Sequence, residues 1–173
     1  MPNICENTLT LRVEYAEFNK IDTLLDNLAE EDCPDTTTFF GYFVPETYVS
    51  TDCEIKDGKM PEWYQWRVEN WGTKWDVAVS DDDKYPNTEL LEHNISDGDD
   101  NWLVYKYETA WSPAVTILTK LSNLVPNCLL TLEYEEETGW GGEYEILRGD
   151  VKELISYENR CYACQSYDTL SYC

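Results

Sequence analysis

The sequence predicts an α+β fold of the ferredoxin-like type, a two-layer sandwich with the order strand-helix-strand-strand-helix-strand. Three observations lead to this prediction. Apolar and polar residues alternate in segments that begin at Thr8, Trp102 and Cys128, and the first two of these are each followed by apolar residues at helical spacing. The chain has 173 residues, 42% of them hydrophobic, which is enough apolar material for one domain core.

The first half of the pattern covers residues 8–34. Residues 8–15 alternate and predict a half-buried strand, and residues 18–34 predict a helix, because apolar side chains recur there every three or four positions before a proline. A Trp-rich insertion at about residues 34–74 follows this helix. Residues 75–80 predict the second strand.

The second half of the pattern begins with an alternating segment at residues 102–108, which predicts the third strand. Ser112 and Pro113 fit the N-cap and the first position of the next helix. The apolar stripe of this helix continues to Pro126 through Val115, Leu118, Leu121 and either Leu124 or Val125.

Residues 128–136 alternate again and predict the fourth strand, with Leu130, Leu132 and Tyr134 facing inward. A further edge strand is expected at Glu143 to Leu147, after a glycine-rich turn. We therefore assign residues 1–150 to a ferredoxin-like domain with its insertion, and residues 151–173 to a C-terminal extension.

The charge is strongly negative. Asp and Glu number 35 against 12 Lys and Arg, which gives a formal net charge of -23 and a sequence pI near 4.1. Direct binding to nucleic acid is therefore not expected, because most of the surface repels phosphate. No apolar run approaches the ~20 residues of a membrane helix, and the first residues do not resemble a signal peptide. We expect a cytoplasmic protein that does not bind membranes.

The distribution of this charge decides what the acidity does. If the net charge were spread evenly over the surface of a folded chain of this mass, there would be roughly one negative charge per 380 Å². Duplex DNA carries roughly one negative charge per 100 Å². Acidic residues gathered on a third of the surface come close to the density of DNA. Clustering therefore separates a protein that imitates nucleic acid from one that is only acidic.

The cysteine pattern does not predict a disulfide framework. The seven cysteines are an odd number at wide spacing, and Cys161 and Cys164 form the only close pair. This pair lies in a polar tail, and no second pair exists to complete a structural zinc site. Incidental thiols, a tail disulfide and a metal site are the three interpretations of the pair.

Candidates for catalysis are few. His93 is the only histidine, which excludes sites that need several histidines, and we expect it in a loop or at a helix end. No phosphate-binding glycine motif is present. The aspartates around Gly98 do not fit an EF-hand, because His93, Ile95 and Val104 would occupy ligand positions. We therefore predict no enzyme activity, no metal and no cofactor.

Three strings resemble a family carried by phages and plasmids and described as having a YubB-type ferredoxin-like domain. They are Met1 to Leu9 (MPNICENTL), Trp66 to Asp76 (WRVENWGTKWD) and Thr109 to Pro113 (TAWSP). The family usually has Trp at the position of Ile4. The resemblance spans residues 1 to about 145 and implies the fold and a mobile-element origin, but no settled activity and no functional residues.

The Trp-Gly-Thr-Lys-Trp string is expected to be mainly structural. Gly72 can adopt a positive φ after a helix that ends near Trp71, which returns Trp71 and Trp75 to one core. Lys74 lies among aromatic residues and can make a cation–π contact. Exposure of Trp63 or Tyr64 would instead favour an interaction surface.

Acidic residues collect on one face of the predicted sheet. The face opposite the helices carries Glu14 together with other glutamates, interrupted by Arg12 and Lys106. Acidic loops and the end of the fourth strand extend this face into a continuous anionic ridge. The residues predicted to bind a partner are Asp81, Asp82, Asp83, Asp97, Asp99, Asp100, Glu108, Glu133, Glu135, Glu136 and Glu137.

The first of three functional hypotheses is a phage-type inhibitor that mimics nucleic acid. It would block the basic nucleic-acid-binding channel of a host protein, such as a CRISPR effector, a restriction enzyme, a polymerase or a repair enzyme. The second is an interaction module that uses its aromatic segment, Trp63 to Trp75. The third is a hydrolase built on carboxylates and a metal. Acidity that serves only solubility in a salty environment is a further alternative, and the oligomeric state is open.

Overall fold

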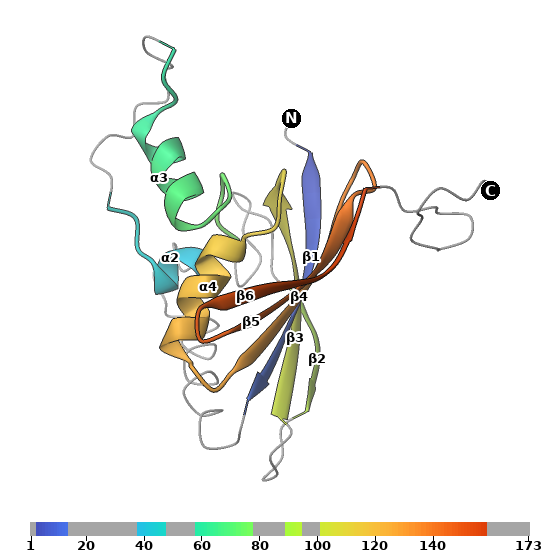
Figure 1. Cartoon of the computed structure of the whole chain (residues 1–173). Helices are drawn as coiled ribbons and strands as arrows, with labels where there is room; N and C mark the ends of the chain where they lie inside the picture. The colour runs from blue at the N-terminus through green and yellow to red at the C-terminus, as the bar shows by residue number, and fades with distance from the viewer. Residues whose placement is uncertain (1–2, 14–37, 48–57, 78–88, 95–100, 159–173) are drawn as a thin grey trace, which may run out of the picture.

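The computed structural model describes residues 3–13, 38–47, 58–77, 89–94 and 101–158. These residues form a six-stranded sheet and the helices that pack on it (Figure 1). The strand order is β2-β3-β1-β4-β5-β6, and every neighbouring pair is antiparallel. The strands are β1 (Ile4–Val13), β2 (Glu89–Asn94), β3 (Asn101–Ala110), β4 (Leu129–Glu136), β5 (Gly141–Leu147) and β6 (Asp150–Tyr157). The helices are α2 (Phe39–Phe43), α3 (Glu62–Asn70) and α4 (Val115–Leu124).

The helices lie on one side of the sheet, so the α+β class is confirmed (Figure 1). Strand β1 lies between β3 and β4, and α4 connects those two strands by crossing over β1. This is the split connection of ferredoxin-like folds. The helix predicted at residues 18–34 lies outside the described residues.

The β1 strand obeys the predicted alternation but begins earlier, at Ile4 rather than Thr8. Leu9, Leu11 and Val13 belong to the buried core, and Cys5 and Asn7 on the same side of β1 are also buried. Asn7 is tolerated in this layer because its side-chain amide donates to the Cys5 carbonyl at 2.8 Å and to Thr109 Oγ1 at 2.9 Å. The polar Asn7 breaks the apolar pattern, which is why the alternation alone starts the strand too late.

Among the described residues the strand that precedes β3 is β2, which corrects the predicted second strand at residues 75–80 for its described part. Trp75 to Val77 form no strand, and residues 78–80 lie outside the described part. Asp76 explains why the chain turns here: its carboxylate accepts hydrogen bonds from the Phe40 and Gly41 amides, both at 2.7 Å, and from the Thr38 hydroxyl. The segment therefore holds α2 in place. Val77 is buried as expected.

Strand β3 and helix α4 lie close to their predicted positions. In β3, Leu103, Tyr105 and Tyr107 are buried and alternate with partly exposed residues. Helix α4 begins at Val115, one residue after its N-cap Ala114, so Ser112 does not act as the N-cap. Leu124 is 61% exposed and Val125 is 6% exposed, which selects Val125 as the last member of the apolar stripe.

Strand β4 alternates as predicted, with Leu130, Leu132 and Tyr134 on the buried side. Strand β5 confirms the predicted strand at residues 143–147, but it does not form the edge, because β6 pairs with it along its whole length. The sheet therefore continues through Tyr157, into the region 151–173 that the sequence assigns to an extension. The sequence does not reveal β6 because its side chains are exposed and its register contains a bulge.

The turn after α3 packs on the core. Gly72 has a φ of +82° directly after α3, and Trp71 is buried, as the sequence predicts. Lys74 lies over the ring of Trp111, with Nζ 5.7 Å from the ring centroid.

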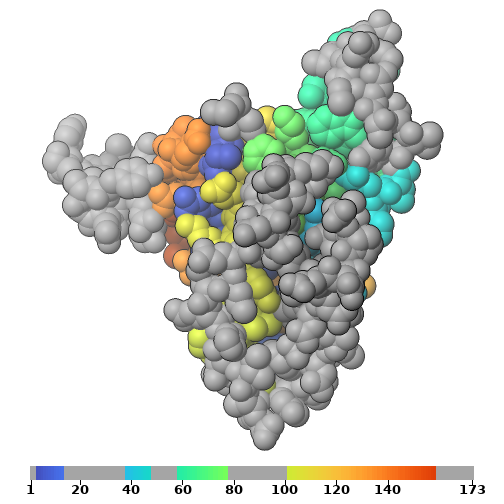
Figure 2. Space-filling view, turned by 180° about the vertical axis from the view of Figure 1, so that it is seen from behind, coloured from blue at the N-terminus to red at the C-terminus, as the bar shows by residue number. Residues whose placement is uncertain are grey.

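Figure 2 shows the molecule from behind. Helix α3, in green, is at the upper right, and residues of β1, β3 and β4 reach the surface to its left.

Candidate functional site on the outer face of the sheet

The sheet has an outer face, defined here as the side of β1, β3, β4, β5 and β6 that the helices do not cover. Alternation along the strands places residues on this face in register across the sheet. Within the described strands, its cations are Arg12, Lys106 and Lys152. The glutamates on it are Glu6, Glu108, Glu133, Glu135, Glu143 and Glu145.

The acidic residues concentrate at one end of this face. Glu6 of β1 is directly opposite Glu108 of β3 on one side and Glu135 of β4 on the other. Glu133 is directly opposite Glu143 of β5. Side chains at directly opposed positions have Cβ atoms ~5 Å apart, so these carboxylates form two adjoining rows of like charge. We call these five glutamates the acidic patch.

A lysine reaches the acidic patch. Lys106 Nζ lies 3.0 Å from Glu6 Oε2, and both side chains are largely exposed. Among the described residues, Glu108, Glu133 and Glu143 form no ion pair. Arg12 lies toward the opposite end of β1, where it is opposite Trp102 and Leu129. The patch therefore keeps a net negative charge that like-charge repulsion makes costly.

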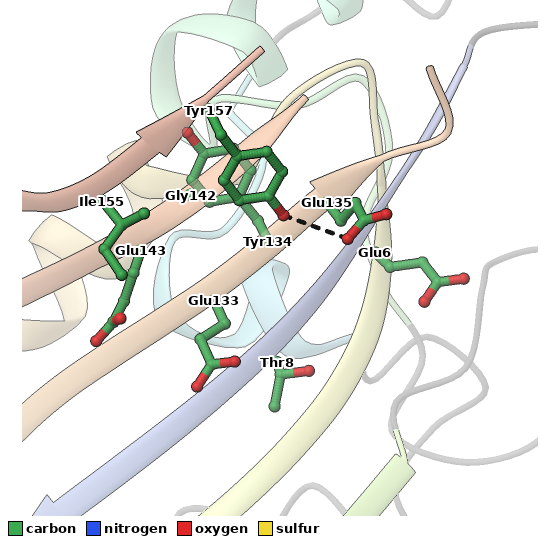
Figure 3. Close-up of a pocket in the computed structure, with 9 residues that line it drawn as sticks. All are labelled: Glu6, Thr8, Glu133, Tyr134, Glu135, Gly142, Glu143, Ile155 and Tyr157. Carbon is green, nitrogen blue, oxygen red and sulfur yellow. Dashed lines mark hydrogen bonds between the residues drawn. The ribbon is translucent and has the colours of Figure 1, made fainter. Parts of the chain in front are cut away.

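A cleft of about 220 Å³ opens over the patch (Figure 3). Carboxylates of Glu6, Glu133, Glu135 and Glu143 line it, and the Tyr157 ring forms an aromatic wall. The Tyr157 hydroxyl donates a hydrogen bond to Glu135 Oε2 at 3.2 Å. Such a surface is suited to a cation with an apolar stem or a flat face, which describes the side chains of lysine and arginine.

Two glycines make room for the aromatic wall. A Cβ on Gly141 would lie 2.5 Å from the Tyr157 hydroxyl oxygen and 2.3 Å from the Tyr134 carbonyl oxygen. A Cβ on Gly142 would lie 2.3 Å from the Ile155 carbonyl oxygen. The glycines predicted as a simple turn thus also let Tyr157 cross over β5 and reach Glu135.

Glu136 does not belong to this surface, which corrects the prediction. It shares the inward phase of β4 with Tyr134, and only 1% of it is exposed. Its carboxylate accepts hydrogen bonds from the Thr138 hydroxyl and from the Thr138 amide at 2.7 Å. Desolvation acts to raise the pKa of Glu136, but these hydrogen bonds, with others from Asn3 and Trp140, hold it below its usual range. Glu136 is a structural carboxylate of the turn.

The other predicted partner-binding residues have different outcomes. Glu108, Glu133 and Glu135 lie on the outer face as expected. Glu137 is exposed in the turn after β4, where its Oε2 accepts a hydrogen bond from the Ile4 amide at 3.2 Å. The loop acids lie outside the described residues, as does Glu14: these are Asp81, Asp82, Asp83, Asp97, Asp99 and Asp100.

Sequence reasoning missed Glu6, Glu143, Glu145 and Tyr157. Glu6 has the same phase in β1 as Thr8, Thr10 and Arg12, so extending the alternation by two residues would have found it. Glu143 and Glu145 lie in a predicted strand, where they alternate with Tyr144 and Ile146, so applying the same alternation to this strand would have placed them on the solvent side. No signal in the sequence marks Tyr157, because β6 has an irregular register.

The residues considered for catalysis do not form a site. His93 lies in strand β2, not in the expected loop or helix end. Cys5 and Cys128 are buried free thiols, and burial raises the pKa of Cys5 to about 12, which keeps it protonated. The other five cysteines lie outside the described residues. Within the described part, no group of three or more His, Cys, Asp or Glu side chains is placed to hold a metal.

A second surface feature lies near α3, at Trp111. This residue has a φ of +65° and is 40% exposed. It is the central residue of a tight turn, in which the Ser112 amide donates a hydrogen bond to the Ala110 carbonyl at 2.8 Å. A bulky residue at positive φ is uncommon and carries strain. Tyr64 packs edge-on against Trp111, and Lys74 lies over its ring. Trp63 and Tyr64 are themselves half-buried.

Comparison with known proteins supports the fold. Residues 92–172, a little under half of the chain, match a family model described as a ferredoxin-like domain in Api92-like protein. The ferredoxin-like character of this region is therefore confirmed. The matched stretch begins in β2 and includes β3 to β6, whereas β1 precedes it. No curated protein and no solved structure matches the chain. None of the helices in the described residues is long and apolar enough to span a membrane.

Proposed function

We propose that this ferredoxin-like protein is an acidic inhibitor, carried by a phage or a related mobile element, that mimics nucleic acid. Its outer face would bind the basic nucleic-acid-binding channel of a host protein in the host cytoplasm. CRISPR effectors, restriction enzymes, polymerases and repair enzymes all have such channels. The observation that carries the proposal is the acidic patch, in which carboxylates face one another across four neighbouring strands.

The charge density of the patch supports mimicry. Residues on one face of a sheet are spaced by ~4.8 Å between strands and ~6.8 Å along a strand, so the eight sheet positions that contain the patch cover about 260 Å². They hold five glutamates and Lys106. The patch then carries about one net negative charge per 65 Å². This density is higher than that of duplex DNA, which carries roughly one negative charge per 100 Å². Averaged over the whole chain, the charge falls well short of this density.

The rigidity of the patch also supports the proposal. Its glutamates stand on the central strands of a sheet whose other side packs on the core, so their backbone positions are fixed before binding. A preorganised set of charges loses little conformational freedom when a partner binds. The partner would supply lysine and arginine side chains, and the cleft beside Tyr157 offers one of them both carboxylates and an aromatic wall.

The test begins with a host protein captured from lysate and continues as a measurement on the purified pair. The dissociation constant should rise by about tenfold or more between about 50 mM and about 500 mM NaCl, and duplex DNA should compete for the same protein. The double variant Glu133→Gln/Glu143→Gln should weaken binding. Its matched control, Glu62→Gln/Glu69→Gln, changes the charge by the same amount on exposed positions of α3.

Two results would contradict the proposal. The first is a dissociation constant that does not change with salt. The second is equal loss of affinity in the two double variants, because that would mean that only the total charge matters and not its position on the sheet.

The exposed Trp111 favours a second candidate, an aromatic interaction module without mimicry. Strained residues persist where the surroundings enforce them and often where function uses them. Trp111→Asn tests this candidate, because asparagine accepts a positive φ while removing the ring. Loss of binding in Trp111→Asn with normal binding in Glu133→Gln/Glu143→Gln would select the aromatic surface over the acidic patch.

A further inference from the structure

Strand β6 is the last strand of the sheet, and within the described residues it has a neighbour, β5, on one side only. It is eight residues long, and all of its residues except Tyr157 are exposed. Val151, Leu154 and Ile155 are each between 40% and 43% exposed. An edge of this length presents unpaired backbone N–H and C=O groups that can hydrogen-bond to another strand.

The edge is only partly protected. Proteins shield such strands with charged side chains, prolines or bulges. In β6 the devices are three charged side chains, Asp150, Lys152 and Glu153, and one bulge. The bulge is at Leu154, since Glu153 is opposite Tyr144 while Ile155 is opposite Glu143. No proline interrupts β6, and its exposed apolar side chains would be buried by an added strand.

The charges around β6 select the kind of strand that fits. Glu143 and Glu145 lie on the outer face of the neighbouring strand, and β6 itself carries Asp150 and Glu153 against a single Lys152. A second copy of the chain would bring the same acids to this edge, together with its own net charge of -23. A strand with arginine or lysine alternating with apolar residues would instead be attracted by the acids on the outer face, and its apolar residues on the other face would cover Val151, which is opposite Ile146.

We propose that β6 binds an extended basic segment of the partner by strand addition, so that the partner strand becomes the seventh strand of the sheet. This inference rests on the proposed function and deepens it. It names the structural element of the partner, a strand with alternating basic and apolar side chains. Backbone hydrogen bonds would give affinity, and the acids beside the edge would set the preference for basic residues.

The test compares two synthetic peptides on the full-length protein. The first is an eight-residue peptide of alternating arginine and valine with blocked ends. The second has the same sequence but is N-methylated at four consecutive central residues, which keeps all charges and side chains and blocks strand pairing on both of its edges. We expect the methylated peptide to bind about tenfold more weakly or worse, by fluorescence anisotropy. Only the unmethylated peptide should slow hydrogen–deuterium exchange in β6.

A pair of variants localises the effect. Leu154→Lys places a charge on the proposed pairing edge and should weaken binding of the unmethylated peptide, while Leu147→Lys adds the same charge at an exposed position in β5. Equal affinity of the two peptides, or exchange protection elsewhere and not in β6, would overturn the strand-addition inference. Salt-dependent but methylation-independent binding would leave the acidic-patch proposal intact. Salt-independent capture of the host partner would overturn that proposal instead.

Discussion

Glu133 on β4 and Glu143 on β5 lie directly opposite each other on the solvent-facing side of the sheet. A directly opposed pair of like charges destabilises a sheet, and the part of the chain that the structure describes provides no cation paired with either one. The neighbouring row Glu108, Glu6 and Glu135 repeats the arrangement. The fold therefore carries a local electrostatic cost in the same place as the proposed binding surface.

The double variant Glu133→Gln/Glu143→Gln should accordingly be more stable than the natural protein. We expect the free energy of unfolding to increase by about 0.5–1 kcal/mol at low salt, because glutamine keeps the shape and removes the repulsion. The gain should shrink at about 500 mM NaCl, where screening already weakens the repulsion. Urea unfolding at both salt concentrations measures it. Glu62→Gln/Glu69→Gln is the control, and a gain of equal size there would assign the effect to total charge.

Gly141→Ala should destabilise the protein and disturb the aromatic wall. The new Cβ would press on the Tyr134 carbonyl oxygen and the Tyr157 hydroxyl. Overpacking of this kind costs about 1–3 kcal/mol in the free energy of unfolding. Gly58→Ala is the comparison, because its Cβ position has open space around it and alanine meets only the strain of a φ of +72° there. Chemical denaturation should give the larger loss at Gly141, and an undiminished stability of Gly141→Ala would show that this steric contact is unimportant.

Glu136 should contribute to stability in a pH-dependent way. Its folded-state pKa lies below the ordinary value of 4.5, so the unfolded state binds the proton more strongly. The contribution is therefore fully present above pH 4.5 and is lost as the pH falls through the folded-state pKa. The difference in unfolding free energy between the natural protein and Glu136→Gln should be largest at neutral pH and should close as the pH falls below 4.5 and through the folded-state pKa. A gap that stays constant with pH would contradict this assignment.

Asp76→Asn should weaken the attachment of α2. Both carboxylate oxygens of Asp76 accept hydrogen bonds, including those from the amides of Phe40, Gly41 and Val77. An asparagine side chain presents a donor where one oxygen stood, which leaves buried N–H groups without an acceptor. The expected loss is about 2–3 kcal/mol in the free energy of unfolding. Urea unfolding measures the loss, and exchange of the Phe40 and Gly41 amides should speed up at the same time.

The strands that could be predicted from the sequence are those whose side chains alternate between core and solvent. Residues 102–108 and 128–136 meet this condition, and the structure places β3 and β4 there. Val77 and Val79 alternate in the sequence as in a strand, but the described residues Trp75 to Val77 form none, because Asp76 uses its carboxylate to cap α2. Backbone capping by a distant residue leaves no periodic signal in the sequence.

The acidic patch was predicted in part. Glu108, Glu133 and Glu135 followed from the phase of their strands, and the same phase places Glu136 in the core. The phase of β1 and β5 also places Glu6 and Glu143 on this face, but that they lie opposite Glu135 and Glu133 depends on the register between strands, which one sequence does not specify. Tyr157 depended on a bulged strand and on the absence of a Cβ at Gly141, and both are properties of the assembled sheet.

The central position of β1 has a consequence for how the chain is made. Leu9 pairs with Tyr105 on one side and with Leu132 on the other, so the earliest of the described strands to be translated has neighbours that are translated much later. During synthesis β1 cannot form its hydrogen bonds in the sheet until β3 and β4 have been translated. Folding should therefore be slow, and Leu9 and Leu11 should stay exposed to water until β3 and β4 are available to pair with β1.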